Sequence, residues 1–163
     1  EPHRAFFGLK DAQQGAVVAR MAADLSFPVE VVPVPTVREA DGLALSSRNK
    51  FLNTDDRRTA TALSRGLFAA ADAVEQGERD GRALQAIVAA EVGNTDAAQD
   101  YAALADAATV QPLTELTTDA FLAVAARVGE TRLIDNVAFS VGADSIVVDR
   151  GERLPGPSVL EES

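Results

Sequence analysis

Two stretches in the first third of the chain carry side chains that suit phosphate binding. In the first, Lys10 and Asp11 follow a glycine and stand where a helix is expected to begin. Free backbone N–H groups and the positive end of the helix dipole favour an anion there, and the Lys10 ammonium adds a point charge. The plainer interpretations are an exposed lysine, and an aspartate that only caps the helix instead of accepting hydrogen bonds from a ribose. Gln14, one turn on, is either a surface residue or a side chain whose amide points into the same crevice.

The second stretch is a polar segment from residue 35 to residue 49. Its end offers two hydroxyls and a guanidinium, from Ser46, Ser47 and Arg48, a combination that suits a polyphosphate. The plain alternative is a turn or helix cap beside a surface arginine. Charged residues earlier in the segment, at positions 38, 39 and 41, are equally consistent with a solvated loop whose ion pairs contribute little.

The elements around these stretches predict that they meet. Residues 5–8 are expected to form a buried strand, and residues 29–34 a second one rich in valine. Between them lies a helix whose inward face is predicted to be the apolar set Val17, Val18, Met21 and Leu25. This is a parallel β-α-β unit, and both polar stretches follow the carboxyl ends of its strands. Ligands bind at that edge of a parallel sheet, so the pattern favours a nucleotide phosphate site.

The rest of the chain predicts a second, α+β unit. One helix is expected from about residue 54, with Leu63, Leu67, Ala71 and Val74 inward, and another over residues 80–92. Strands are expected over residues 99–104, 121–128 and 131–137, the last two joined by a hairpin turn at Gly129 and Glu130. The predicted organisation is a nucleotide-binding piece over residues 1–36, a C-terminal domain over 37–140 with a phosphate-binding loop at 37–49, and a flexible tail over 141–163.

Composition excludes several kinds of site. The 163 residues include no cysteine and one histidine, His3, so a disulfide, a thiolate nucleophile or a multi-histidine metal site cannot be built. The net charge of −10 argues against a nucleic-acid partner, and residues 51–163 carry all of it, because residues 1–50 hold six cations and six anions. No apolar run suits a membrane span or a signal peptide, so we expect a cytoplasmic protein. Without an initiator methionine, the chain is expected to be a piece of a longer polypeptide.

Long motifs then connect the chain to a known family. Residues 7–14 (FGLKDAQQ) and 35–49 (PTVREADGLALSSRN) closely resemble the pantoate–β-alanine ligase family. Further matches are Asp100-Tyr101 with Leu104 and Asp106, and residues 131–136 (TRLIDN). The resemblance covers residues 4–138. It implies the last β-α-β unit of a Rossmann-like nucleotidyl-transferase domain, followed by a small C-terminal domain of helices and antiparallel sheet.

The resemblance also implies a reaction and roles for single residues. Enzymes of this family join (R)-pantoate to β-alanine with ATP and Mg²⁺, through a pantoyl adenylate, releasing pyrophosphate and AMP. Lys10 and Arg48 would be the catalytic residues, and Gln14 would bind pantoate. The implied ATP-binding residues are Gly8 and Asp11 at the ribose, the backbones of Val37 and Leu45 at the adenine, and Lys10, Ser46, Ser47 and Arg48 at the phosphates. Mg²⁺ would bind through the phosphates, and the parent enzyme would be a homodimer.

The chain departs from the family pattern in one large respect. The His-x-Gly-His motif, a second pantoate-binding glutamine and the acidic residues near Mg²⁺ lie in an upstream half that is not in this sequence. We therefore expect the piece alone to be inactive. Leu9, Ala12 and Leu45 are smaller departures that concern packing around the nucleotide. The alternatives are a non-catalytic nucleotide-binding or interaction module, or another adenylyl-transferring enzyme. Residues 38–49 are expected to be mobile without ATP, because their charges lack a fixed anion.

Overall fold

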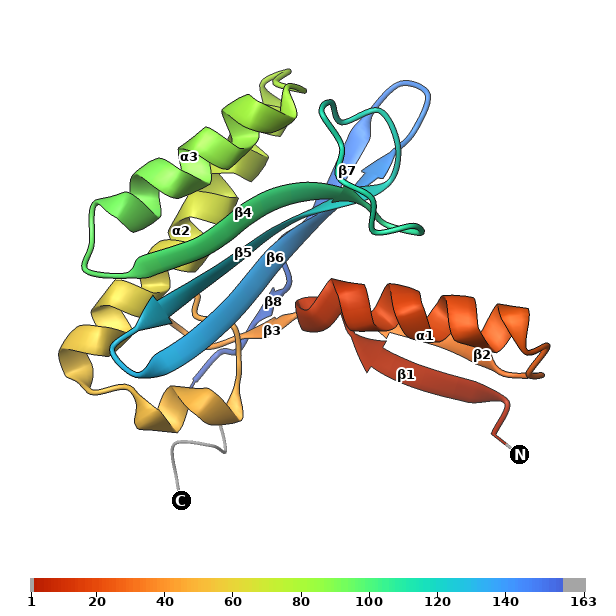
Figure 1. Ribbon diagram of the computed structural model, residues 1–163, viewed down its shortest axis with the longest axis horizontal. Coiled ribbons are helices and arrows are strands. Elements are labelled where there is room, and N and C mark those ends of the chain that lie inside the picture. The colour runs from red at the N-terminus through yellow and green to blue at the C-terminus, as the bar shows by residue number, and fades with distance from the viewer. Residues whose placement is uncertain (1, 157–163) are drawn as a thin grey trace.

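The computed structural model describes residues 2–156, which form a β-α-β unit packed against an α+β domain (Figure 1). The first unit consists of β1 (Arg4–Gly8), a 3-10 turn (Leu9–Asp11), α1 (Ala12–Asp24) and β2 (Glu30–Val34). β1 and β2 pair in parallel, in a register that places Gly8 beside Val34. The predicted parallel unit is confirmed, and the chain leaves both strands at the same edge.

The predicted burial of this unit is wrong in two places. Phe6 on β1 is 65% exposed, because the burial alternates along the strand and one face is uncovered. On α1, the apolar stripe expected to face inward is instead largely open: Val17 is 57% exposed and Met21 47%. Ala22 is the buried residue of that helix. The larger side chains Val17, Met21 and Leu25 are exposed, so within the described chain this apolar face of α1 is not covered.

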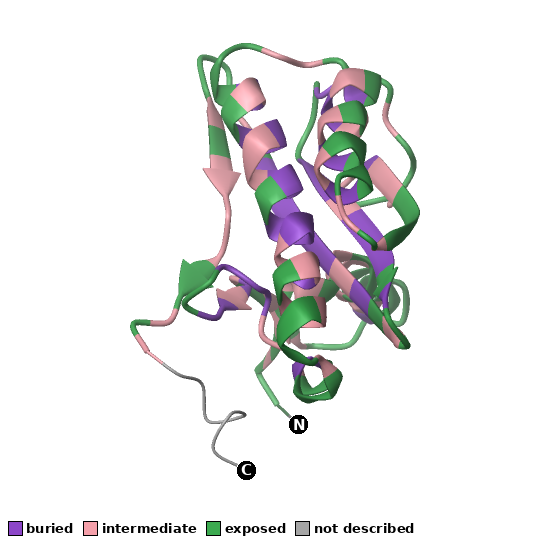
Figure 2. Cartoon of the chain, turned by 90° about the vertical axis from the view of Figure 1, so that its left-hand side faces the viewer, coloured by how far each residue is buried: buried purple, intermediate pink, exposed green. Residues whose placement is uncertain are grey.

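The second unit is a four-stranded antiparallel sheet covered on one face by two helices (Figure 1). The helices are α2 (Thr54–Glu75) and α3 (Gly81–Gly93). The strands, in the order in which they pair, are β4 (Ala98–Asp106), β5 (Ala120–Val128), β6 (Thr131–Val141) and β7 (Ile146–Asp149). Figure 2 shows that buried residues gather where the helices meet the sheet, and this contact is the main core.

The helices and the hairpin follow the sequence prediction closely. Asn53 caps α2 by accepting the N–H groups of Asp55 and Asp56, and Asp80 caps α3 in the same way. The predicted inward residues of α2 are all buried. Val128 pairs with Thr131, so the two-residue turn between β5 and β6 is confirmed. Among the described residues, no helix is long and apolar enough to cross a membrane.

The expectation of a frayed tail from residue 141 is wrong for the part of it that the structure describes. Ile146–Asp149 adds the fourth strand to the main sheet, and β8 (Glu152–Arg153) pairs in parallel with β3 (Val37–Arg38). Glycine and polar residues here form tight turns between short strands instead of ending the fold. Residues 157–163 of the predicted tail lie outside the described residues.

The close contact between β3 and β8 requires a glycine at position 151. Its φ is +80°, and a Cβ at this position would lie 2.2 Å from the carbonyl oxygen of Thr36. Gly151→Ala is therefore expected to lower the free energy of unfolding by at least about 1–2 kcal/mol, the cost of a left-handed conformation alone. Urea denaturation measures this. Gly93→Ala is the matched control, because its Cβ would meet nothing within 4 Å; an equal loss in both variants would contradict the argument.

The loop over residues 37–49 is packed, which contradicts the reason given for its mobility. Its two carboxylates already have a protein partner: Arg57 binds Glu39 at 2.6 Å and Asp41 at 2.9 Å. The side chain of Asn49 donates to Glu39 Oε1 at 2.6 Å and to the carbonyl of Ala44 at 3.1 Å. A 3-10 turn, Ser47–Phe51, closes the segment. The loop is thus held by its own ion pairs and hydrogen bonds.

Candidate functional site

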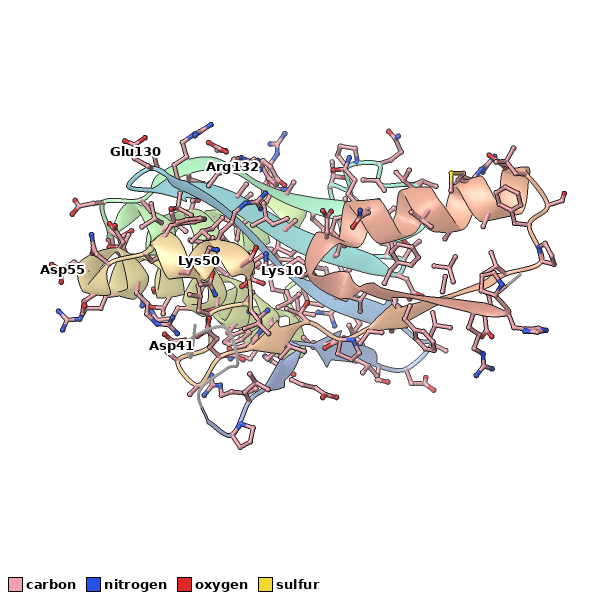
Figure 3. All side chains as sticks on the ribbon, turned by 90° about the horizontal axis from the view of Figure 1, so that it is seen from below. Lys10, Asp41, Lys50, Asp55, Glu130 and Arg132 are labelled. Atoms are coloured by element: carbon pink, nitrogen blue, oxygen red, sulfur yellow. The ribbon has the colours of Figure 1, made fainter. Side chains whose placement is uncertain are left out.

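Lys10 lies at the junction of the two units, at the end of α1 that faces the sheet (Figure 3). It sits in the 3-10 turn between β1 and α1, so the strand end and the helix start together set its position. Asp11 accepts the backbone N–H of Gln14 at 3.2 Å, which confirms the predicted helix cap. The N-terminus of a 13-residue helix therefore opens beside the ammonium. This combination favours an anion.

The ammonium group of Lys10 is partly buried. Burial lowers the pKa of the Lys10 ammonium below the ordinary lysine value; Asp135 opposes this, while the positive charge of Arg48 adds to it. Arg48 is thus an electrostatic neighbour of Lys10, although its own side chain is exposed. A partly buried ammonium attracts an anion more strongly than an exposed lysine does.

The second predicted stretch presents its polar groups to solvent. Ser46 is half-buried, and its Oγ accepts the backbone N–H of Arg48 at 3.2 Å. Ser47 and Arg48 are exposed. The backbones of Val37 and Leu45 lie side by side, because the Leu45 N–H donates to the Val37 carbonyl at 2.9 Å. That bond occupies one polar group of each residue, so an adenine would have to use others.

A buried ion pair lies beneath the second stretch. Arg38 is 1% exposed and grips Asp135 of β6 with two hydrogen bonds, of 2.7 Å and 3.0 Å. It also donates to the carbonyls of Gly42 and Asn136, and its guanidinium lies 4.9 Å from the ring centre of Phe68. From the sequence, a solvated loop was one of two equal interpretations of Arg38. That interpretation is wrong, since Arg38 is buried and bonded both to the loop and to β6.

The residue after Asp135 reaches the first stretch. The side-chain amide of Asn136 donates to the carbonyls of Leu9 at 2.7 Å and of Lys10 at 2.9 Å. Sequence reasoning assigned no role to either residue, although both belong to the matched motif over residues 131–136. The available signal was a pair of adjacent polar residues between the apolar runs 133–134 and 137–139 of the strand, which indicates a buried polar contact.

A cavity of about 360 Å³ extends from Lys10 along the uncovered face of the sheet. Lys10, Asp11 and Asn136 line its end at the junction, and Arg132 lines it further along β6 (Figure 3). Gln13 lines this cavity, whereas Gln14 is exposed and is not among the lining residues. The structure thus brings Lys10 and Asp11 into one hollow, and it leaves Gln14 and the Ser46–Arg48 stretch outside the walls of that hollow.

The described residues contain no cluster of three or more histidine, cysteine, aspartate or glutamate side chains that would hold a metal ion. Mg²⁺ usually keeps several waters and binds through one or two carboxylates together with substrate phosphates. A magnesium cage built only from such side chains is therefore not found among the described residues.

Comparison with known proteins identifies the fold and the family. The family model described as pantoate-beta-alanine ligase matches residues 1–138. The chain belongs to the pantoate–β-alanine ligase family. It is 46% identical to the pantothenate synthetase of Moorella thermoacetica over 142 residues, and 55% identical to that of Rubrobacter xylanophilus over 141 residues. These alignments cover 86% and 85% of the chain but 50% and 48% of the relatives, so the chain spans about half their length.

Solved structures of this ligase family confirm the expected fold class. The pantothenate synthetase of Thermus thermophilus superposes with a TM-score of 0.77 at 44% identity, covering 82% of this chain and 49% of that one. The pantoate-beta-alanine ligase of Francisella tularensis, solved in complex with β-γ ATP and β-alanine, gives a TM-score of 0.51 at 25% identity. That match covers 82% of this chain and 42% of that one. The predicted combination of an α/β piece and a small α+β domain is correct.

Proposed function

We propose that the protein containing this chain condenses pantoate with β-alanine at the expense of ATP. Family membership supports this reaction, and so does the close match to pantothenate synthetases. The observation that carries the proposal is the position of the partly buried Lys10 at the start of α1, in a cavity that Asp11 and Asn136 also line. An ammonium and a helix N-terminus at one sheet edge suit a nucleotide polyphosphate, and the exposed Arg48 would add its charge.

The proposed chemistry has two steps. In the first, a pantoate carboxylate oxygen attacks the α-phosphorus of ATP; the bond to the β-phosphate bridging oxygen breaks, and pyrophosphate leaves with the electron pair. In the second, the β-alanine amine attacks the acyl carbon of the pantoyl adenylate; AMP leaves and the amine loses a proton. Such steps need aligned reactants and stabilisation of the negative charge that develops on the phosphates. Lys10 and Arg48 provide the positive charge for this in the chain.

Further residues complete the proposed site. Gly8 and Asp11 would contact the ribose. Gln14 would bind pantoate after its exposed side chain changes conformation. The backbones of Val37 and Leu45 would hold the adenine, and the hydroxyls of Ser46 and Ser47 would bind phosphate. Mg²⁺ would enter with ATP.

The proposal extends to the whole protein. Residues 1–36 would complete a nucleotide-binding domain together with an upstream half. The C-terminal domain, which carries the 37–49 loop, would run from residue 37 past residue 140 and include β7 and β8. The enzyme would be a cytoplasmic homodimer. The 163-residue chain alone would be inactive, because it lacks the His-x-Gly-His motif.

The test compares this chain with the complete polypeptide that contains it. With ATP, pantoate and β-alanine, the complete polypeptide should release AMP and pyrophosphate in equal amounts, and the 163-residue chain should release none. Exchange of labelled pyrophosphate into ATP should require pantoate but not β-alanine. A folded complete polypeptide that forms no pantothenate would support the alternative of a non-catalytic module. Exchange that depends on a different acid would indicate another adenylyl transferase.

A further inference from the structure

The two stretches that carry Lys10 and Arg48 are both bonded to adjacent residues of β6. Asn136 is 4% exposed, and its amide nitrogen donates one hydrogen bond to the carbonyl of Leu9 and one to the carbonyl of Lys10. These contacts join residues more than 120 positions apart in the chain. A single side chain therefore holds two consecutive carbonyls, and so it fixes the orientation of the peptide group from which the Lys10 side chain projects.

The neighbouring residue, Asp135, binds the stretch that leads to Arg48. Asp135 is 3% exposed, and its carboxylate binds the guanidinium of Arg38 and accepts the backbone N–H of Asn136 at 2.8 Å. Arg38 in turn donates to the carbonyl of Gly42 at 3.2 Å, which ties it to the segment leading to Ser46. Adjacent residues of one strand thus hold the backbone on both sides of the candidate phosphate site.

We propose that Asn136 is the positioning residue for Lys10, holding its backbone so that the ammonium meets the nucleotide phosphates. This inference rests on the proposed function. The chemistry of the side chain explains the choice of residue, because a planar amide offers two N–H donors from one nitrogen. An aspartate of the same size would face two carbonyl oxygens with acceptors alone. An alanine would leave both carbonyls without this donor in a nearly buried place.

The kinetic test uses the complete polypeptide carrying Asn136→Ala. Misplacement of a catalytic group by about 1 Å costs on the order of 100-fold in rate, so kcat for pantoate-dependent pyrophosphate release should fall by about that factor. The KM for β-alanine should change less than twofold, because Asn136 is proposed to act on the first step. Asn136→Asp should lose as much as the alanine variant, and Asn136→Gln, which keeps the amide donors, should recover part of the rate. The exposed Asn94→Ala is the matched control and should retain the wild-type rate.

A second readout separates positioning from mere support of the fold and does not depend on turnover. Reductive methylation with ¹³C-formaldehyde gives an NMR signal for each lysine, and Lys10→Ala assigns the signal of Lys10. In the Asn136→Ala protein the pKa of Lys10 should rise toward the ordinary lysine value, because the released loop would expose its ammonium to water. An unchanged Lys10 titration would overturn the proposal, whatever the loss of rate, and so would a rate within twofold of wild type. If the wild-type protein makes no pantothenate, the proposed function fails, and the titration still decides whether Asn136 positions Lys10.

Discussion

Replacing Arg38 with methionine is expected to lower the free energy of unfolding by about 3–5 kcal/mol, the usual cost of breaking a buried ion pair by removing one partner. The reason is the state in which the change leaves Asp135. Burial raises the pKa of the Asp135 carboxyl, and the guanidinium of Arg38 is the principal group that opposes this rise. Without Arg38 the carboxyl is left either charged in a desolvated place or protonated, and both states cost free energy. Urea denaturation followed by circular dichroism measures the loss.

A double variant tests this explanation. Adding Asp135→Leu to Arg38→Met removes the stranded carboxylate, and replacing a buried ion pair by apolar side chains is often close to neutral. The double variant should therefore be more stable than Arg38→Met alone. Arg20→Ala is the matched surface control: its ion pair with Asp24 is exposed and should matter little. A single variant with the wild-type denaturation midpoint would show that the Arg38–Asp135 pair does not hold the loop.

Arg38 also shows where sequence reasoning reached its limit. A charged residue in a polar, turn-rich segment is normally solvated, and local sequence cannot reveal a carboxylate 97 positions away. The contact becomes visible only when β6 is placed beside the loop. The same holds for Asn136, whose partners are backbone carbonyls and therefore leave no trace in side-chain types.

The helices α2 and α3 and the strands β4 to β6 were predictable because local signals and burial agree there. The apolar stripe of α2 runs through Leu63 and Leu67 to Val74, and all three are almost completely buried. On α1 the same type of pattern misled, since Met21 remains 47% exposed in the described part of the chain. Periodicity identifies an apolar face, but what covers that face is a matter of tertiary structure.

The C-terminal strands escaped prediction for a different reason. β7 has four residues and β8 has two, so neither is long enough to show a period. Their stability comes from partners that lie elsewhere in the chain, as the pairing of Glu152 with Val37 illustrates. Lys10 could be proposed from the sequence because its signal is local: a strand, a glycine, a lysine and a helix cap lie within a few residues of one another.

Replacing Lys10 with alanine in the complete polypeptide is expected to lower kcat for pyrophosphate release by about 10²–10³-fold, the usual cost of removing one group that stabilises transition-state charge. The effect should be large because the ammonium is partly buried beside a helix N-terminus, where water would replace it poorly. Lys50→Ala is the matched control. Lys50 is exposed and lies 5.2 Å from the ring centre of Phe51, so its removal should leave the rate nearly unchanged. Equal losses in the two variants would indicate a general effect of positive charge.

The role of Lys10 can also be tested at equilibrium, through the pH dependence of anion binding. Burial lowers the pKa of Lys10, so its positive charge is complete well below that pKa and disappears as the pH rises through it. At neutral pH the wild-type protein should therefore bind pyrophosphate more tightly than the Lys10→Ala protein does. The difference should begin to shrink at a pH below the ordinary lysine pKa. Calorimetric titration of both proteins over this range measures it, and the comparison cancels the ionisation of pyrophosphate itself. A constant difference up to the ordinary lysine pKa would mean that the Lys10 ammonium is fully solvated and has no special place in the site.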